Sequence, residues 1–200
     1  MTGTELKILQ AIIGDQTHQY SIRGISKELK MLYPQVHKAV QVMLEKELLI
    51  SEKQGKNIIL SLDARSVREE YIIAELERKR NVLDKHPILQ LVEKDFEKMP
   101  YSQFICVLFG SYALGKAKKD SDIDLLFVIP EEYDYGAFEK AVRNCLTVPR
   151  LDINITTGKG LMEMWNTPLK LNVGNELLSR HIILRGAEQF LYLRRRYNFG

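Results

Sequence analysis

The first part of the chain carries apolar stripes at helical spacing, separated by short polar breaks. Apolar residues recur at helical positions from Leu6 to Ile13, and Gly14 ends that run. A second stripe follows Ser21, a residue type that caps helix N-termini. A third begins at Pro34, which suits a first helical turn because its missing N–H would be unpaired there anyway. The pattern predicts three short helices.

Residues 48–62 predict a β-hairpin, since two apolar runs flank a polar turn that contains Gly55. Three helices followed by a hairpin resemble the winged helix-turn-helix domains of many prokaryotic DNA-binding proteins, over about the first 62 residues. Lys30-Met31 depart from that family, because a glycine or small polar residue is more usual at the turn between the two helices.

The winged-helix resemblance implies contacts with double-stranded DNA. The residues expected to read the major groove are Gln35, His37, Lys38 and Gln41. Lys53 and Lys56 in the hairpin would meet the DNA backbone. The alternative is a helix-turn-helix used for protein contacts, in which these side chains are merely exposed.

A charged segment and then a mixture of strands and helices follow the hairpin. Residues 66–84 predict one helix with a solvated charged face, and His86-Pro87 ends it. Strands are predicted at residues 104–109, 123–129 and 151–156. Helices are predicted at residues 88–99, 135–146, 159–165 and 173–184.

These elements indicate an α+β protein in which the C-terminal part has a small mixed sheet flanked by helices. We expect a winged helix-turn-helix domain at residues 1–65, a connecting helix at 66–86 and a second domain at 87–200. In this second domain, Trp165 and Tyr192 are expected to pack, His181 to lie at a helix surface or partly buried, and Arg194 to Arg196 to form a solvated terminus.

Composition excludes few classes of partner, metal site or cellular compartment. The formal net charge of +3 is compatible with a polyanionic partner but also common in proteins that bind none. Cys106 and Cys145 form no CxxC pair, which favours reduced, buried thiols over a zinc or redox site. Neither a signal peptide nor a membrane-spanning run is visible, so we expect a cytoplasmic protein without membrane contacts.

The segment from Phe109 to Leu126 carries the candidate chemistry. Gly110 and Ser111 directly follow a predicted strand, where a glycine lets backbone N–H groups approach a phosphate. Asp122 and Asp124 are two apart on the next strand, so their side chains share one face. Such a carboxylate pair suits a hard divalent ion that also takes phosphate oxygens.

Asp152 opens the strand after the following helix. If that strand lies beside the one that holds Asp122 and Asp124, Asp152 completes a site of three carboxylates. We assign it as a metal ligand and as the group that takes a proton from an attacking hydroxyl. The alternative is an ordinary carboxylate at a strand edge or turn.

Ser111 and Asp122 are separated by ten residues, and Asp122-Ile123-Asp124 follows. This Gly-Ser, ten residues, Asp-x-Asp pattern resembles the minimal nucleotidyltransferases of the DNA polymerase β-like superfamily, over roughly residues 88–190. The resemblance implies transfer of a nucleoside monophosphate from ATP or another nucleoside triphosphate, with two Mg²⁺ ions and release of pyrophosphate.

One departure from the family concerns Leu114, where many members carry an arginine. Lys116 is our candidate for the missing phosphate contact, with Lys118 or Lys119 as substitutes; a merely solvated loop is the alternative.

Three functions follow from these patterns. The first is a nucleotidyltransferase that modifies a protein or a small molecule. The alternative is a DNA-binding regulator, working as a homodimer, whose C-terminal domain only senses a nucleotide. A third, compatible with the first, is an antitoxin-like role, because related minimal nucleotidyltransferases are often paired with a helical HEPN-type partner.

Overall fold

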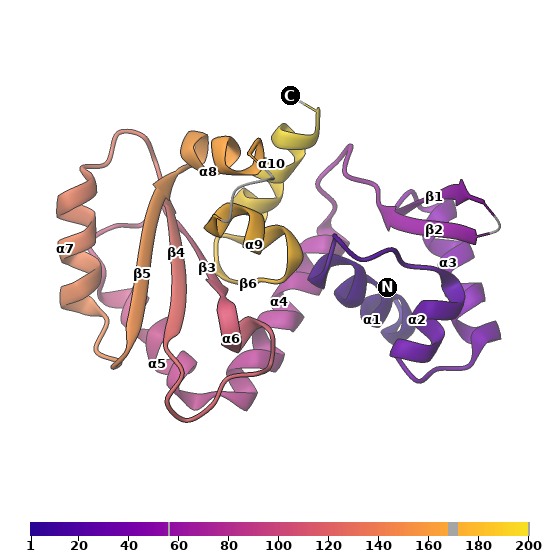
Figure 1. Cartoon of the computed structure of the whole chain (residues 1–200), viewed down its shortest axis with the longest axis horizontal. Coiled ribbons are helices and arrows are strands. Elements are labelled where there is room, and N and C mark those ends of the chain that lie inside the picture. Colours follow the sequence, from indigo (N-terminus) through magenta and orange to yellow (C-terminus); the bar gives the residue numbers. More distant parts are fainter. Residues whose placement is uncertain (56, 168–171, 200) are drawn as a thin grey trace.

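The computed structural model describes residues 1–55, 57–167 and 172–199, and it confirms the α+β class. Helices and a hairpin from the N-terminal part lie on one side of Figure 1, and a mixed sheet with its helices lies on the other. Lys56, one of the expected DNA contacts, lies outside the described residues.

The N-terminal part contains the three predicted helices and the predicted hairpin. The helices are α1 (Gly3–Gly14), α2 (Ile22–Glu28) and α3 (Tyr33–Glu45). Strands β1 (Leu49–Gln54) and β2 (Asn57–Leu62) pair antiparallel. This arrangement is consistent with a winged helix-turn-helix, as the sequence suggested.

Local hydrogen bonds fix where these helices begin and turn. Thr2 and Glu5 form a reciprocal capping box at the start of α1, and the Ser21 hydroxyl accepts the Gly24 N–H at 3.1 Å before α2. Lys30 has a left-handed backbone with φ of 53° in the turn between α2 and α3. The turn is held by the Ser26 hydroxyl, which donates to the Met31 carbonyl at 2.7 Å.

The charged helix α4 (Glu69–Lys85) joins the two parts of the molecule and has a buried face in addition to its solvated charged one. Tyr71, Ala74 and Glu75 are buried, because α4 packs between α1 on one side and the sheet region on the other. After α4 the chain forms α5 (Pro87–Asp95), whose start at a proline follows the predicted break.

The sheet has four described strands in the order β5-β4-β3-β6. They are β3 (Ile105–Phe109), β4 (Ile123–Ile129), β5 (Leu151–Thr157) and β6 (Ile182–Arg185). Strands β4 and β5 are parallel and are connected through α7 (Tyr135–Cys145), whereas β3 pairs antiparallel with both β4 and β6. The predicted strands and the mixed sheet are confirmed.

The remaining helices are α6 (Gly110–Ala113), α8 (Gly158–Trp165), α9 (Val173–Ser179) and α10 (Ala187–Phe199), and a short 3₁₀ turn, η1, follows α5. The prediction of one helix over 173–184 is wrong at its end. Helix α9 stops at Ser179, and Ile182–Leu184 belong to β6, because this apolar run completes the sheet beside β3.

Alternating residues of β3 and β4 divide the sheet into two faces. One face packs on α5 and α7, with Leu125, Phe127 and Phe138 in its core. The other packs on α8, α9 and α10, with Leu126, Val128, Leu161, Trp165, Leu177 and Phe190 in its core. Trp165 therefore packs as expected. Among the described residues, no helix combines the length and apolarity needed to cross a membrane.

A buried polar cluster joins α4 to the sheet region. Glu75 pairs with Arg78 at 2.6 Å between Oε2 and Nη1, and its other oxygen lies 3.5 Å from His181 Nε2. Arg78 donates to the His181 carbonyl, and His181 Nδ1 lies 2.7 Å from the Leu177 carbonyl oxygen. His181 is 1% exposed, so the expectation of a surface or partly buried histidine is wrong.

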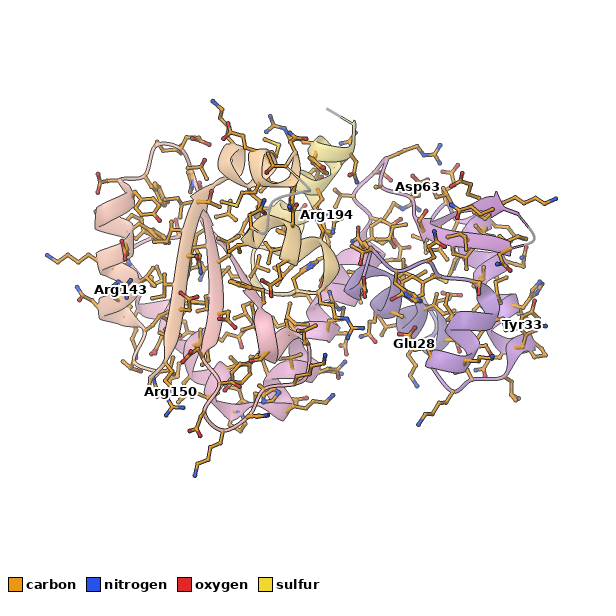
Figure 2. All side chains as sticks on the ribbon, in the orientation of Figure 1. Glu28, Tyr33, Asp63, Arg143, Arg150 and Arg194 are labelled. Atoms are coloured by element: carbon orange, nitrogen blue, oxygen red, sulfur yellow. The ribbon has the colours of Figure 1, made fainter. Side chains whose placement is uncertain are left out.

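Arg194 borders the same region and corrects the expectation of a solvated C-terminal tail. It lies on α10, on the side labelled in Figure 2, with only 9% of its surface exposed, and the charge of Glu75 on α4 acts on it. Its neighbours Arg195 and Arg196 are exposed, as the sequence suggested. Burial lowers the pKa of Arg194 to about 10, which still leaves it charged at neutral pH.

Candidate functional site

The link between β3 and α6 is shaped around one carboxylate. Gly110 has a φ of +63°, and a Cβ on this residue would overlap the Asp124 side chain. The next residue, Ser111, donates its backbone N–H to Asp124. Glycine is required here by both the left-handed backbone and the close approach of the carboxylate. In this structure the Ser111 N–H therefore faces Asp124, and α6 is a single turn.

Sheet register places the three candidate aspartates together. Asp124 on β4 is the direct Cα partner of Asp152 on parallel β5, and Phe109 at the end of β3 is the partner of Asp124 on the other side. Asp122 lies just before β4, not on it, and its charge acts on Asp124 from two residues away. Asp124 and Asp152 lie on the sheet face that α8, α9 and α10 cover, because the alternating residue Leu126 belongs to that core.

The electrostatics of Asp124 reflect this crowding. Burial raises the pKa of Asp124, and the neighbouring charges of Asp152, Glu176 and Asp122 raise it further, against the lowering effect of the Ser111 N–H. Asp122 and Asp152 are exposed, whereas Asp124 is partly buried. Negative charges held this close favour binding of a cation.

Glu176 on α9 is a member of this acidic group that sequence reasoning missed. It lies 24 residues after Asp152 in the sequence, in a short helix with no recognisable motif. Only packing of α9 over the sheet brings its charge near Asp124. No local sequence signal points to it.

The donor set fits a divalent metal ion whose coordination is completed by the substrate. Carboxylate oxygens are the ligands that Mg²⁺ prefers, and Mg²⁺ is usually held by one or two carboxylates together with substrate phosphates and water. Within the described part of the chain, no three His, Cys, Asp or Glu side chains converge closely enough to enclose an ion by themselves. The carboxylates suit an open site, because Mg²⁺ takes its remaining ligands from substrate phosphates and water.

Basic residues near this end of the sheet come from two loops. Lys116, Lys118 and Lys119 are exposed in the loop between α6 and β4, and the Lys116 N–H donates to the Ser111 carbonyl at 2.9 Å. Arg150, which sequence reasoning missed, directly precedes β5 and donates to Asp120 at 2.9 Å. Figure 2 shows Arg150 at the lower end of β5, the end where Asp152 begins the strand.

The expected DNA contacts are mostly exposed on the N-terminal part. His37, Lys38 and Gln41 are exposed on α3, and Lys53 is exposed on β1. Gln35 is also exposed but donates to the Thr4 hydroxyl of α1 at 3.0 Å, so this contact would have to break before Gln35 could reach a base. Tyr33 and His37 pack their rings 5.8 Å apart on the same helix surface.

Comparison with known families supports the identity of the sheet region. Residues 89–157 match the model of a family described as the nucleotidyltransferase domain. This range contains Gly110, Ser111 and the three candidate aspartates, but it ends before α8, so residues 158–190 lie outside the match. Searches of curated proteins and of solved structures returned no match. The chain therefore carries a nucleotidyltransferase domain at residues 89–157.

Proposed function

We propose that the chain transfers a nucleoside monophosphate from ATP or another nucleoside triphosphate to a protein or a small-molecule acceptor. The observation that carries this proposal is the register pairing of Asp124 on β4 with Asp152 on β5. Asp122 directly precedes β4, and the glycine turn at Gly110 packs against Asp124. Together with the nucleotidyltransferase domain, it supports metal-assisted phosphoryl chemistry.

In this proposal each residue has a separate task. Asp122, Asp124 and Asp152 hold Mg²⁺, which would supply neutralising charge for the phosphates when it is bound, and two such ions suit this chemistry. Asp152 is exposed and takes the proton of the attacking hydroxyl. Lys116 contacts the phosphates, and the turn at Gly110 and Ser111 holds the Asp124 carboxylate beside them.

Isothermal titration with ATP, with and without Mg²⁺, tests the site, and a pyrophosphate-release assay tests turnover. We expect the double variant Asp122→Asn/Asp124→Asn to lose at least about tenfold in Mg²⁺-dependent affinity, because two ionised metal ligands are removed. Asp84→Asn is the matched control, since Asp84 is exposed on α4. Equal binding and turnover in the double variant and the wild type would exclude the proposed site.

A DNA-binding regulator is the second candidate function, and the exposed polar surface of α3 favours it. We propose a winged helix-turn-helix domain at residues 1–65, a connecting helix at 66–86 and a nucleotide-handling domain at 87–200, with homodimerisation matching a palindromic site. His37, Lys38 and Gln41 would enter the major groove, with Gln35 after release from Thr4. Lys53 would meet the DNA backbone from the hairpin, as Lys56 was expected to do.

Fluorescence anisotropy with a duplex from the region upstream of the protein's own coding sequence tests this function. Affinity should fall steeply between about 50 and 200 mM salt, and Lys38→Ala should reduce the salt slope by about one if Lys38 contacts a phosphate. Lys94→Ala on α5 removes an equal charge far from α3 and should change nothing. No rise in the anisotropy of the duplex at low salt would exclude DNA regulation.

An antitoxin-like role remains compatible with nucleotidyl transfer, since the acceptor would then be a HEPN-type helical partner. The exposed apolar side chains Leu76 on α4 and Leu91 on α5 are compatible with protein contacts. Purification of the tagged chain from its native host tests for a stable complex. Recovery of this chain alone would argue against the role.

A further inference from the structure

A large cavity lies at the end of the sheet opposite the three aspartates. Its volume is about 1150 Å³, and its walls come from the start of β3, the end of β4, the first turn of α8 and one side of α10. Such a volume is sufficient for a small-molecule ligand, which typically needs several hundred Å³.

The strand register separates this cavity from the candidate catalytic site. Ile105 and Val128, which line the cavity, are partners in the β3–β4 ladder, whereas the same ladder reaches Asp124 at its other end. Val128 lies four residues beyond Asp124 on β4, which corresponds to about 13 Å along the strand. The cavity and the aspartates are therefore different sites on one sheet.

Charges around the cavity are predominantly positive. Lys159, Arg185 and Arg196 line it, against Glu131 as the one acidic residue of its lining. Glu131 already accepts the backbone N–H of Lys159 at 3.3 Å, so part of its charge is compensated locally. The balance favours an anionic occupant.

Arg185 is held in place before any ligand binds. Its Nη2 donates to the Ser102 carbonyl at 3.1 Å, and its guanidinium carbon lies 4.6 Å from the centre of the Phe104 ring. A cation that is stacked and hydrogen-bonded on one side keeps its other N–H groups available in a defined direction. Arg185 therefore suits recognition of a planar carboxylate, sulfonate or phosphate group.

The rest of the wall suits a flat apolar body. Tyr192 on α10 has 47% of its surface exposed and borders the cavity, next to Leu193 and opposite Met162 of α8. Aromatic, thioether and aliphatic side chains offer adaptable contacts to an aromatic ring. Gly158 leaves room at the start of α8, where an added Cβ would lie 3.2 Å from Leu193 Cδ2.

We propose that this cavity is a second binding site, which takes a small aromatic anion independently of the nucleotide at the aspartates. The anionic group lies among Lys159, Arg185 and Arg196, and the aromatic body packs against Tyr192 and Met162. The proposal requires only binding and does not depend on whether the domain catalyses nucleotidyl transfer.

Two fluorescent probes of similar shape test the proposal: 1-anilinonaphthalene-8-sulfonate, which is an anion, and N-phenyl-1-naphthylamine, which is neutral. We expect saturable binding of one sulfonate per chain. The charge-reversed variant Lys159→Glu/Arg196→Glu should bind the sulfonate at least about tenfold more weakly, because hydrogen bonds to charged groups are among the stronger polar contacts. The neutral probe should bind both proteins equally.

Lys94→Glu/Lys140→Glu is the matched control, since it makes the same change in net charge at exposed positions on α5 and α7. It should retain the wild-type affinity for the sulfonate. Tyr192→Ala tests the apolar wall without changing charge and should weaken binding of both probes. Circular dichroism of each variant checks that it is folded, and Tyr192→Ala carries the test if charge reversal prevents folding.

Three results would overturn the proposal. One is equal loss of sulfonate binding in the control variant, which would indicate a nonspecific charge effect. Another is equal affinity of the wild type for the neutral and anionic probes, which would remove the anion preference. The third has two parts: Mg²⁺-ATP competes with the sulfonate, and the Lys159→Glu/Arg196→Glu variant no longer binds ATP. Together these results would make the cavity part of the nucleotide site.

Discussion

Gly110 shows how one residue without a side chain supports the candidate site. Its backbone has a positive φ, and the space that a Cβ would fill is taken by the Asp124 carboxylate. From the sequence we expected a glycine at this turn to leave space for a phosphate to approach the backbone. In the structure, the nearest occupant is the carboxylate itself, which the Ser111 N–H also contacts.

Replacing Gly110 with alanine should therefore disturb both backbone and site. We expect Gly110→Ala to lower stability by about 1–2 kcal/mol through the left-handed backbone alone and to reduce Mg²⁺-dependent ATP affinity by displacing Asp124. Urea denaturation and isothermal titration measure the two effects.

Gly55→Ala separates the two causes. Gly55 has a similar φ of +60°, but no described residue outside its chain neighbours lies within 4 Å of its added Cβ. It should show the backbone cost with unchanged ATP affinity. Unaltered ATP binding in Gly110→Ala would mean that the position of Asp124 does not depend on this glycine.

Helix α4 shows how a charged element can be part of a core. Its charge run predicts a solvated face, yet one of the charged residues, Glu75, is 1% exposed and paired with Arg78. On the same helix, Tyr71 donates its hydroxyl to the Leu48 carbonyl at 2.8 Å. Helical periodicity places Glu75 and Arg78 one turn apart on the same side. Which side is buried depends on α1, β6 and α10, which pack around α4.

Removing the buried member of this pair should cost much more than removing an exposed acid. We expect Glu75→Ala to lower the free energy of unfolding by about 3 kcal/mol or more, because Arg78 would be left buried without its partner. Glu69→Ala changes an exposed acid on the same helix and should stay within about 0.5 kcal/mol. Urea denaturation measures the loss of stability in both variants. Similar losses would show that the buried Glu75–Arg78 pair contributes no more to stability than an exposed acid does.

The segment 173–184 shows where element boundaries depend on partners. Asn172 caps α9, and its side chain accepts the Asn175 N–H at 2.8 Å, so the helix start is a local property. Its end is not local, because Ile182 and Ile183 pair with Leu108 and Val107 of β3. A short apolar run is compatible with either a helix or a buried strand. Here it forms a strand, because the edge of β3 offers backbone groups for it to pair with.

At the scale of the whole molecule, the two parts meet at a polar junction. Burial lowers the pKa of His181, opposed by the nearby Glu75 carboxylate and assisted by the positive charges of Arg78 and Arg194. Burial opposes ionisation of Glu75, but its pKa is also lowered, because the charge of Arg78 and the hydrogen bonds from His181 and Arg78 outweigh this effect. His181 also contacts the Leu177 carbonyl of α9, the helix that carries Glu176.

This junction should make stability depend on pH. The folded-state pKa of His181 lies below its ordinary value of 6.5, so the unfolded chain takes up the proton first. The contribution of His181 is therefore fully present above about pH 7 and is lost as pH falls through 6.5 towards the lowered pKa. Urea denaturation of the wild type between about pH 5 and 7.5 should show this decline.

His181→Asn provides the comparison, because its side-chain amide can still donate to the Leu177 carbonyl. We expect lower stability than the wild type at neutral pH but a flatter profile below it. His37→Asn replaces an exposed histidine and should keep the wild-type slope. An equal slope in His181→Asn would assign the pH dependence to other groups.

The sequence by itself determined most local features: the caps, the hairpin turn, the apolar strands and the Gly-Ser and Asp-x-Asp spacing. These features depend on residues that are close along the chain, so hydrophobic periodicity and turn residues are enough to predict them. It also supplied Asp152 as a candidate, although only the parallel register of β4 and β5 set Asp152 beside Asp124.

Tertiary structure alone decided the features that depend on residues far apart in the chain. The charge of Glu176 near Asp124, the burial of Glu75, His181 and Arg194, and the basic cavity at the far end of the sheet arise only when helices pack on it. Burial and charge proximity are properties of packed neighbours, and a pattern along one chain does not encode which neighbours those will be.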